Sequence, residues 1–317
     1  MLKKWFKKLF NLLERPWPYF FTFHLRPKKA DKIGIVSDKL INYPKVAIVM
    51  QGPIIYDQDF TLETIKIYKK LFPQVIIILS TWDYEKKEYI EEIKKETEEV
   101  LLNKVPSEKG VQNINFQIVS SLSGIKRAKE LDVEYVFKTR TDQRIYGVNS
   151  LEYLVNILEK FSAVGDYRQK KRIIGCSLNS FKYRMYGISD MNLFGQIDDL
   201  FNYWDINLVD NQGTTYAPEA KFNEVHLATS FLKRIGCEVK WTLEDSWRTF
   251  ADCFAIVDEQ SLDIYWYKYA RMKEYRYVRY DSERNDQEMT FREWFNIYTG
   301  LQNKSSVDLN KIKKIIP

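Results

Sequence analysis

The sequence predicts an α/β protein built on a mostly parallel sheet that helices cover. Three apolar runs, at residues 46–50, 75–79 and 135–137, alternate with stretches of helical periodicity. Strands that are buried on both faces are apolar without alternation, and helices must then cover the sheet. The chain has 317 residues and 45% hydrophobic content, which suffices for a full core. Because no linker separates the halves that follow residue 45, we expect one continuous unit.

The first half of this unit is predicted to alternate strands and helices. Turn residues mark the boundaries, since Gly52 and Pro53 close the first strand and Pro73 ends the first long helix. In order, the predicted elements are strand Val46–Met50, helix 60–72, strand Val75–Leu79, a charged helical stretch that ends near Val100, helix 114–131 and strand Tyr135–Asp142. Ligands of such sheets bind beyond the carboxyl ends of the strands, where the polar residues of this sequence gather.

The second half has a less regular pattern. Its predicted elements are strand Arg172–Cys176, strand Asp190–Gly195, helix Ile197–Trp204 and helix Pro218–Ile235. The last helix has the clearest ends, because Pro218 suits a first helical position and Gly236 suits the position after the last turn. Residues 265–298 combine aromatic and basic side chains. Aromatic residues at helical spacing are usually core, and the alternative is that they stack on sugar rings.

The net positive charge of the chain comes from an amino-terminal arm. The whole chain has a formal charge of +6, and residues 1–29 alone hold eight Lys/Arg and one acidic residue. The rest of the chain is therefore nearly neutral, which does not fit a nucleic-acid-binding surface. We expect no nucleic acid among the partners.

Residues 1–15 predict an amphipathic helix. On a helical wheel the basic side chains occupy one arc and the apolar ones the other. The apolar set is Leu2, Trp5, Phe6, Leu9, Phe10, Leu12 and Leu13. This composition is typical of a helix that lies in the plane of an anionic membrane surface, and the alternative is a helix that packs on the protein body. Pro16 and Pro18 end the helix, so residues 1–44 form a basic amphipathic arm and linker.

Several classes of protein are disfavoured. No apolar run approaches the roughly 20 residues of a membrane-spanning helix, and Lys7 and Lys8 interrupt the run that a secretory signal needs. Cys176, Cys237 and Cys253 are odd in number and widely spaced, which disfavours disulfides or zinc and fits a reducing compartment. The sequence lacks the motifs of serine hydrolases, P-loop kinases and dinucleotide oxidoreductases.

A charged cluster ends the strand that begins at Tyr135. Lys138, Arg140 and Asp142 alternate there, so their side chains are expected to share one face. Two cations and a carboxylate at the carboxyl end of a parallel strand suit a bound diphosphate. The alternative is a salt-bridged strand end without a ligand.

The order of these parts resembles the nucleotide-sugar domain of the GT-A glycosyltransferases. The amino-acid sequences of five motifs are similar to those of the WavE family of bacterial lipopolysaccharide-synthesis proteins. The motifs are VAIVMQGP at 46–53, LSTW at 79–82, NINFQIVSS at 113–121, KTRTD at 138–142, and Ser189-Asp190. Since the resemblance covers roughly residues 45–298, we expect one GT-A-like catalytic domain over 45–300 and a tail over 301–317.

The resemblance implies transfer of a sugar from a nucleotide-sugar donor to a lipopolysaccharide or capsular polysaccharide acceptor. The acceptor would be lipid-linked or a polysaccharide, and the protein would work peripherally at the cytoplasmic face of the bacterial inner membrane. The implied donor-binding residues are Gln51, Gly52, Pro53, Thr81, Trp82, Asn115, Gln117, Lys138, Arg140 and Asp142.

The metal motif of GT-A enzymes is altered in this sequence. Where that motif has Asp-x-Asp, the chain has Arg140-Thr141-Asp142. A Mg²⁺ or Mn²⁺ ion that bridges a diphosphate usually needs one or two carboxylates, and Asp142 would be the single nearby ligand. Two cations beside it disfavour a tightly held ion. Lys138 and Arg140 can instead neutralise the leaving diphosphate directly.

An inverting sugar transfer needs a general base near the acceptor hydroxyl, ordinarily an Asp or Glu. Glu219 is our first candidate because it opens the helix predicted from Pro218, and Asp190 is the second. Glu219 also complements a helix dipole, and Asp190 also suits a turn cap, so both structural explanations stay open. Asp142, beside the donor diphosphate, completes the expected catalytic set. We interpret His226, which lies beside an apolar row, as a core-edge residue.

Two alternatives to a glycosyltransferase remain open at this point. One is a nucleotidyl- or phosphotransferase of surface-glycan synthesis that uses the same cationic strand end. The other is a membrane-bound assembly scaffold that retains the fold without catalysis. Nucleotide binding separates the scaffold from both enzymes, and product mass separates the two enzymes from each other.

Overall fold

The computed structural model describes residues 2–16, 25–34, 44–97, 99–269 and 288–300. Three sequence predictions fall partly or wholly outside these ranges: most of the linker in 16–44, most of the cationic stretch in 265–298, and the tail 301–317. None of the helices formed by the described residues is both long and apolar enough to cross a membrane.

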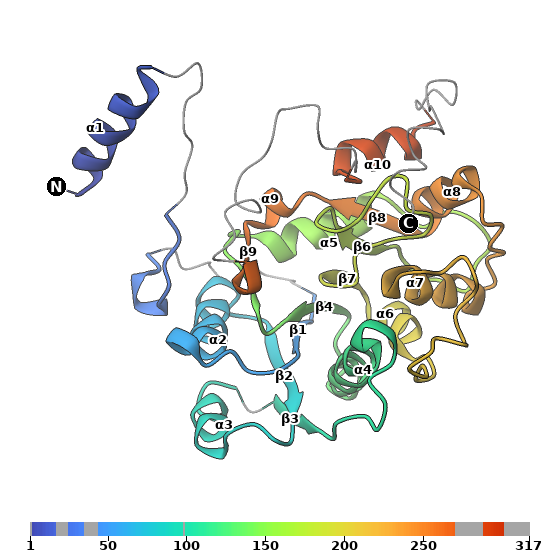
Figure 1. Cartoon of the computed structure of the whole chain (residues 1–317), viewed down its shortest axis with the longest axis horizontal. Coiled ribbons are helices and arrows are strands. Elements are labelled where there is room, and N and C mark those ends of the chain that lie inside the picture. The colour runs from blue at the N-terminus through green and yellow to red at the C-terminus, as the bar shows by residue number, and fades with distance from the viewer. Residues whose placement is uncertain (1, 17–24, 35–43, 98, 270–287, 301–317) are drawn as a thin grey trace.

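The described residues form a seven-stranded sheet, which is the centre of the fold (Figure 1). In spatial order its strands are β3 Glu99–Asn103, β2 Ile76–Trp82, β1 Val46–Gln51, β4 Tyr135–Arg140, β7 Leu193–Gln196, β6 Ile173–Cys176 and β8 Phe254–Val257. The first four strands run parallel, and β7 is antiparallel to both β4 and β6. The predicted fold class, a mostly parallel α/β sheet flanked by helices, is confirmed.

A second, two-stranded sheet lies beyond the end of β4. It pairs β5 Gln143–Ile145 with β9 Ile264–Trp266 in antiparallel register, with Gln143 opposite Trp266. Because β5 follows β4 after two residues, this ribbon places a segment from late in the chain directly beside the carboxyl end of the central strand.

Helices cover the sheet. The α-helices are α1 Leu2–Glu14, α2 Phe60–Leu71, α3 Lys87–Lys94, α4 Ile114–Glu130, α5 Ser150–Lys160, α6 Ile197–Trp204, α7 Asn223–Arg234, α8 Leu243–Cys253, α9 Glu259–Leu262 and α10 Phe291–Tyr298. Single 3₁₀ turns are η1 Ala30–Lys32, η2 Asp57–Asp59, η3 Val111–Asn113 and η4 Tyr267–Tyr269. Side chains of Thr242 and Thr290 cap α8 and α10 by accepting backbone N–H groups of Asp245 and Glu293, which fixes where these helices begin.

The helices and strands with the clearest hydrophobic patterns were predicted correctly. Strands β1 and β2 and helices α2, α4 and α6 lie within two or three residues of their predicted bounds. The strand predicted to reach Asp142 ends at Arg140, and Asp190 precedes β7 instead of beginning it. The edge strand β3 was missed because charged residues flank and begin its short apolar run.

The helix predicted from Pro218 begins at Asn223 instead. Residues 217–221 form turns, in which the Ala220 N–H donates to the Ala217 carbonyl at 2.8 Å. The residue before the helix, Phe222, is extended. The first-turn acid of α7 is consequently Glu224, and Glu219 is exposed in the preceding turn.

Helix α4 approaches β1 closely at Gly124. A Cβ on this glycine would lie 2.3 Å from a Val49 methyl group, and both residues are buried. The glycine is therefore needed for the close contact between helix and sheet.

We expect Gly124→Ala to lower the free energy of unfolding by about 1–3 kcal/mol, because overpacking a stiff β-branched neighbour outweighs the gain in helix propensity. Denaturant titration measures this, and the exposed Lys126→Ala variant on the same helix should stay within about 0.5 kcal/mol of the parent. Adding Val49→Ala to Gly124→Ala should recover part of the loss. An unchanged denaturation midpoint in Gly124→Ala would contradict the close contact.

Candidate functional site

Polar groups meet at the carboxyl ends of β1, β2 and β4, and the loop after β1 is locked to the end of β4. The Thr141 backbone N–H donates to the Gln51 carbonyl at 3.0 Å, and its hydroxyl donates to the Pro53 carbonyl at 2.6 Å. Gly52 has a φ of 118°, and a Cβ there would lie 3.0 Å from the Thr141 hydroxyl oxygen. The Gln51 side chain accepts a hydrogen bond from Ser120 of α4 at 2.8 Å. This loop is therefore rigid, and glycine is required in it.

The end of β2 is tied to the same loop by Glu85. Its carboxylate accepts the Ile54 backbone N–H at 2.9 Å, the Thr81 hydroxyl at 3.1 Å and the Tyr56 hydroxyl. Burial is the main reason that the pKa of Tyr56 is raised, and the hydrogen bond to Glu85 acts in the same direction. Thr81 is wholly buried behind this network, so it positions the loop.

An exposed tyrosine extends beyond the buried end of β2. Trp82 is 1% exposed, whereas Tyr84 is 60% exposed and its ring stacks against Trp82 at 6.5 Å with 14° between the planes. An exposed aromatic ring held by a buried one offers a flat apolar surface at the strand end. Sequence reasoning selected Trp82 and missed Tyr84, although the Trp-x-Tyr spacing was available in the sequence.

Asn115 and Gln117, in the first turns of α4, are positioned differently from each other. The Asn115 amide donates to the carbonyls of Glu108 and Val209 and accepts the Val209 N–H at 2.8 Å. Asn115 therefore holds two loops together. The Gln117 side-chain oxygen is buried and has no hydrogen-bond partner among the described residues.

Arg140 and Asp142 form a bidentate ion pair just past the end of β4. Arg140 Nε and Nη2 lie 2.8 and 3.0 Å from the two carboxylate oxygens, and the Trp266 indole N–H donates to one of them at 3.0 Å. Burial alone would raise the pKa of Asp142, but the Arg140 contacts and the indole hydrogen bond keep it below its usual value. Trp266 was not found from the sequence because 124 residues separate it from Asp142.

Lys138 is fully buried. Its ammonium donates to the Asp190 backbone carbonyl at 2.6 Å and lies 4.6 Å from the Trp204 ring centre. Burial lowers the pKa of Lys138 to about 7. The side chain thus contacts the loop before β7 and α6, and the expected direct contact with a diphosphate does not fit this burial.

Two buried acids lie on the loop before β7 and in the first turn of α7. Asp190 is 6% exposed and Glu224 is 7% exposed. The pKa of Glu224 is raised, first by burial and then by the charge of Asp190, against the opposing charge of Arg184. Arg184 forms an ion pair with Glu224. Glu224, which the sequence analysis missed, takes the first-turn position of α7 that was assigned to Glu219.

The comparison with protein-family models gives one match, described as WavE lipopolysaccharide synthesis, over residues 46–306. The chain belongs to the WavE family. No curated protein matches it in a sequence comparison. The protein is therefore a member of a family of lipopolysaccharide synthesis, as its motifs indicated.

Solved structures share only remote similarity with this WavE-family chain. A cytidylyltransferase from Leptospira borgpetersenii is 13% identical with a TM-score of 0.32, covering 56% of this chain and 71% of that one. Core-mannan synthase A from Aspergillus fumigatus, in a Mn/GDP form, is 9% identical with a TM-score of 0.31, covering 77% and 81%. A mannose-1-phosphate geranyltransferase from Thermus thermophilus is 12% identical with a TM-score of 0.25, covering 42% and 41%.

The WavE-family site does not fit a tightly held divalent cation. Both Asp142 oxygens accept N–H groups from Arg140, and one also accepts the Trp266 indole. Among the described residues, no three His, Cys, Asp or Glu side chains gather into a group that could hold a metal ion. One engaged carboxylate beside a guanidinium is a poor ligand set for Mg²⁺ or Mn²⁺.

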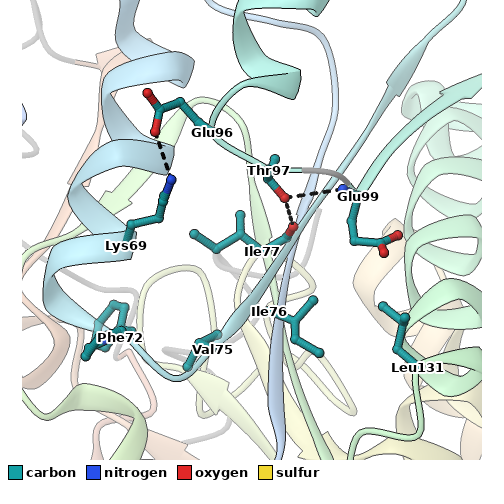
Figure 2. A pocket seen from close by; sticks show the side chains of 10 residues that line it. Lys69, Phe72, Val75, Ile76, Ile77, Glu96, Thr97, Glu99 and Leu131 are labelled. Atoms are coloured by element: carbon teal, nitrogen blue, oxygen red, sulfur yellow. Dashed lines mark hydrogen bonds and ion pairs between the residues drawn. The ribbon is translucent and has the colours of Figure 1, made fainter. Parts of the chain in front are cut away.

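A groove in the described part of the chain lies away from this edge. Figure 2 shows this groove of about 370 Å³, lined by side chains that include Phe72, Val75 and Ile76, with the Lys69–Glu96 ion pair at its side. It lies at the amino end of β2, whereas ligands of parallel sheets bind beyond the carboxyl ends. We assign it no part in the reaction.

His226 lies in α7, two residues after Glu224. Its ring stacks on Tyr216 at 4.0 Å with 7° between the planes. Burial lowers the pKa of His226 to about 4, so this imidazole is neutral at physiological pH, as expected of a core-edge residue.

We expect His226 to make the WavE-family protein less stable as the pH falls from about 6.5 to about 4, because only the unfolded chain then binds its proton. His226→Phe keeps a ring on Tyr216 and removes the titrating group. The slope of unfolding free energy against pH should therefore be up to about 1.4 kcal/mol per pH unit smaller in the variant over this interval. Denaturant titrations at several pH values measure it, and equal slopes would contradict the prediction.

Proposed function

We propose that this protein transfers a sugar from a nucleotide-sugar donor to a lipopolysaccharide or capsular polysaccharide acceptor. Membership of a lipopolysaccharide-synthesis family supports a role in glycan synthesis. The observation that carries the proposal is the Arg140–Asp142 ion pair at the carboxyl end of the central strand, under the Trp266 indole. A fixed guanidinium at this edge suits the negative charge that develops on a leaving diphosphate.

The donor side is proposed to consist of few exposed groups on a rigid support. The Arg140 side chain is 25% exposed and is held by Asp142. Tyr84, exposed at the end of β2, is proposed to stack on the base of the donor. Gly52 and Pro53 allow the diphosphate to approach the backbone, while Gln51, Thr81 and Asn115 hold the loops from behind.

The acceptor side is proposed to lie at Asp190 and Glu224. An inverting transfer needs a carboxylate that removes the acceptor proton as the glycosidic bond forms. Asp190 stays a candidate base, and Glu224 replaces Glu219 as the second because Glu224 is buried and feels the charge of Asp190. The base takes the hydroxyl proton, the acceptor oxygen bonds to the anomeric carbon, and the bond to the nucleoside diphosphate breaks.

The amino-terminal helix is proposed to hold the protein on the cytoplasmic face of the inner membrane. In α1, Trp5, Leu12 and Leu13 are 59%, 63% and 46% exposed. Exposed apolar side chains on a helix whose sequence is rich in lysine suit an anionic lipid surface. A lipid-linked acceptor would then be concentrated beside the enzyme.

A thermal-shift screen with UDP, GDP, CMP and dTDP sugars tests the proposed function. A donor at 100 times its dissociation constant should stabilise the fold by about 2.7 kcal/mol. Mass spectrometry of the product then separates sugar transfer from nucleotidyl or phosphoryl transfer. A chain that binds none of these nucleotides would be a scaffold, contrary to the proposal.

We expect Asp142→Asn to lower turnover by about 100-fold or more, because it releases the guanidinium that meets the leaving group. Arg140→Ala should weaken donor binding by at least about tenfold. Rates with a radiolabelled donor and titration calorimetry measure the two effects. Arg127→Ala, which removes a partly exposed ion pair to Glu99 on β3, is the matched control. Full activity in both site variants would mean that the ion pair is only structural.

Activity is expected to persist, at least in part, when divalent ions are removed with EDTA. The reason is that Arg140 occupies the carboxylate that an ion would need. The measurement compares initial rates before and after dialysis against EDTA. Complete loss that Mn²⁺ or Mg²⁺ restores would show that an ion is essential.

Deleting residues 1–15 should release the protein from anionic vesicles while turnover of a soluble acceptor survives. Binding of the full chain should weaken with salt, because the lysines of α1 act through screened charges. Co-sedimentation with phosphatidylglycerol vesicles measures both effects. Equal co-sedimentation of the truncated and full chains would locate lipid contact elsewhere.

A further inference from the structure

The buried lysine of β4 makes an unusual set of contacts. Lys138 is 0% exposed, and its ammonium contacts the Asp190 carbonyl and the face of Trp204. The ion pairs found among the described residues do not include it. Burying an ammonium without a directly paired carboxylate costs several kcal/mol, so an apolar residue would serve the core better. A buried charge that lowers the stability of the core in this way suggests a functional role for the residue.

The contacts of β4 and β5 converge on one loop. Lys138 holds the Asp190 carbonyl, and Thr139 donates to the Asn192 side chain at 2.9 Å. Asn192 in turn donates to Gln143 at 3.0 Å. The loop that carries Asp190 is thus fixed along the central strand by consecutive polar side chains.

Charges of both signs act on Lys138 and on the acids near it. Asp190 and Asp142 attract the ammonium and Arg140 repels it. From α7, Glu224 feels the charge of Asp190 and is paired with Arg184. Arg184 is thus paired with the Glu224 carboxylate, whereas Lys138 holds the Asp190 backbone carbonyl and attracts the Asp190 charge without forming an ion pair. Since these acids repel each other, the positive charges of Lys138 and Arg184 offset part of that repulsion.

Polar atoms without partners line the same region. Among the described residues, the Ser189 and Tyr203 hydroxyls and the Trp204 indole N–H are buried and lack hydrogen bonds. The charge of Asp190 raises the pKa of Tyr203 further above the value that burial imposes. Buried polar atoms without partners are rare in folded proteins, and three of them around Lys138 and Asp190 suit a polar ligand group.

We propose that Lys138 is a positioning residue of the acceptor side, which fixes the Asp190 backbone and places a positive charge beside Asp190. This inference rests on the proposed function, because it assigns Asp190 the role of base. It assigns Lys138 to the acceptor side of the site instead of to the donor diphosphate.

The first test needs no substrate. In the full chain with ¹³Cε-lysine, the Lys138 signal is assigned by its absence in Lys138→Arg, and its titration is followed by NMR. Asp190→Asn should lower the midpoint of this titration by about one pH unit, because an attractive charge is lost. Glu159→Gln, which removes a partly exposed partner of Lys171, is the control and should leave it unchanged. An unchanged midpoint in Asp190→Asn would overturn the coupling.

The second test uses the donor identified by thermal shift. Lys138→Met should lower kcat at least about tenfold and leave the donor KM within about twofold. In a plot of kcat against pH, the fall of kcat at the acid side, which we call the acid limb, should move to higher pH in this variant. Lys138→Arg, which keeps the charge, should retain the limb of the parent. Equal losses in both variants with an unmoved limb would overturn the inference. If the parent turns over none of the donors, the proposed function fails, and the NMR titration still decides whether Lys138 and Asp190 are coupled.

Discussion

The ion pair between Arg140 and Asp142 is the interaction on which the arrangement of the site depends. It lies just beyond the central strand, is largely buried, and is completed by the Trp266 indole at 3.0 Å. The Asp142 carbonyl also accepts the Tyr267 N–H at 2.8 Å. A buried ion pair is tolerated only when its remaining donors and acceptors are satisfied. The pair therefore requires that the β5–β9 ribbon close against the sheet.

The same ribbon connects the site to the arm. Asp263, which precedes β9, pairs with Arg26, and Arg144 of β5 donates to the Lys28 carbonyl at 3.1 Å. Tyr146 donates to the Pro27 carbonyl at 2.7 Å. Residues 26–28, which come after α1 in the chain, are thus held against the ribbon that also carries Trp266.

Most polar side chains at the carboxyl edge hold the backbone in place. Gln51, Glu85 and Asn115 each bind groups of a neighbouring element. These contacts restrict the conformations of the loops in the absence of any ligand. The few exposed groups, among them Tyr84 and Arg140, are therefore already oriented. Because most polar residues of the motifs are used to hold the backbone, only a few polar side chains are left exposed at this edge.

The sequence by itself determined the class of fold and the family, and it predicted the edge of the sheet at which the candidate site lies. Continuous apolar runs are local features, and they are long enough in β1, β2 and β4 to identify parallel strands and hence the edge at which polar residues collect. The tertiary structure alone decided which polar residues are buried and which are exposed at this edge. It brought Trp266 to Asp142, buried Lys138, began α7 at Asn223 and so put Glu224 where Glu219 was expected. The physical reason is that burial and hydrogen-bond partners depend on contacts between distant segments, which the periodicity of a single segment does not contain.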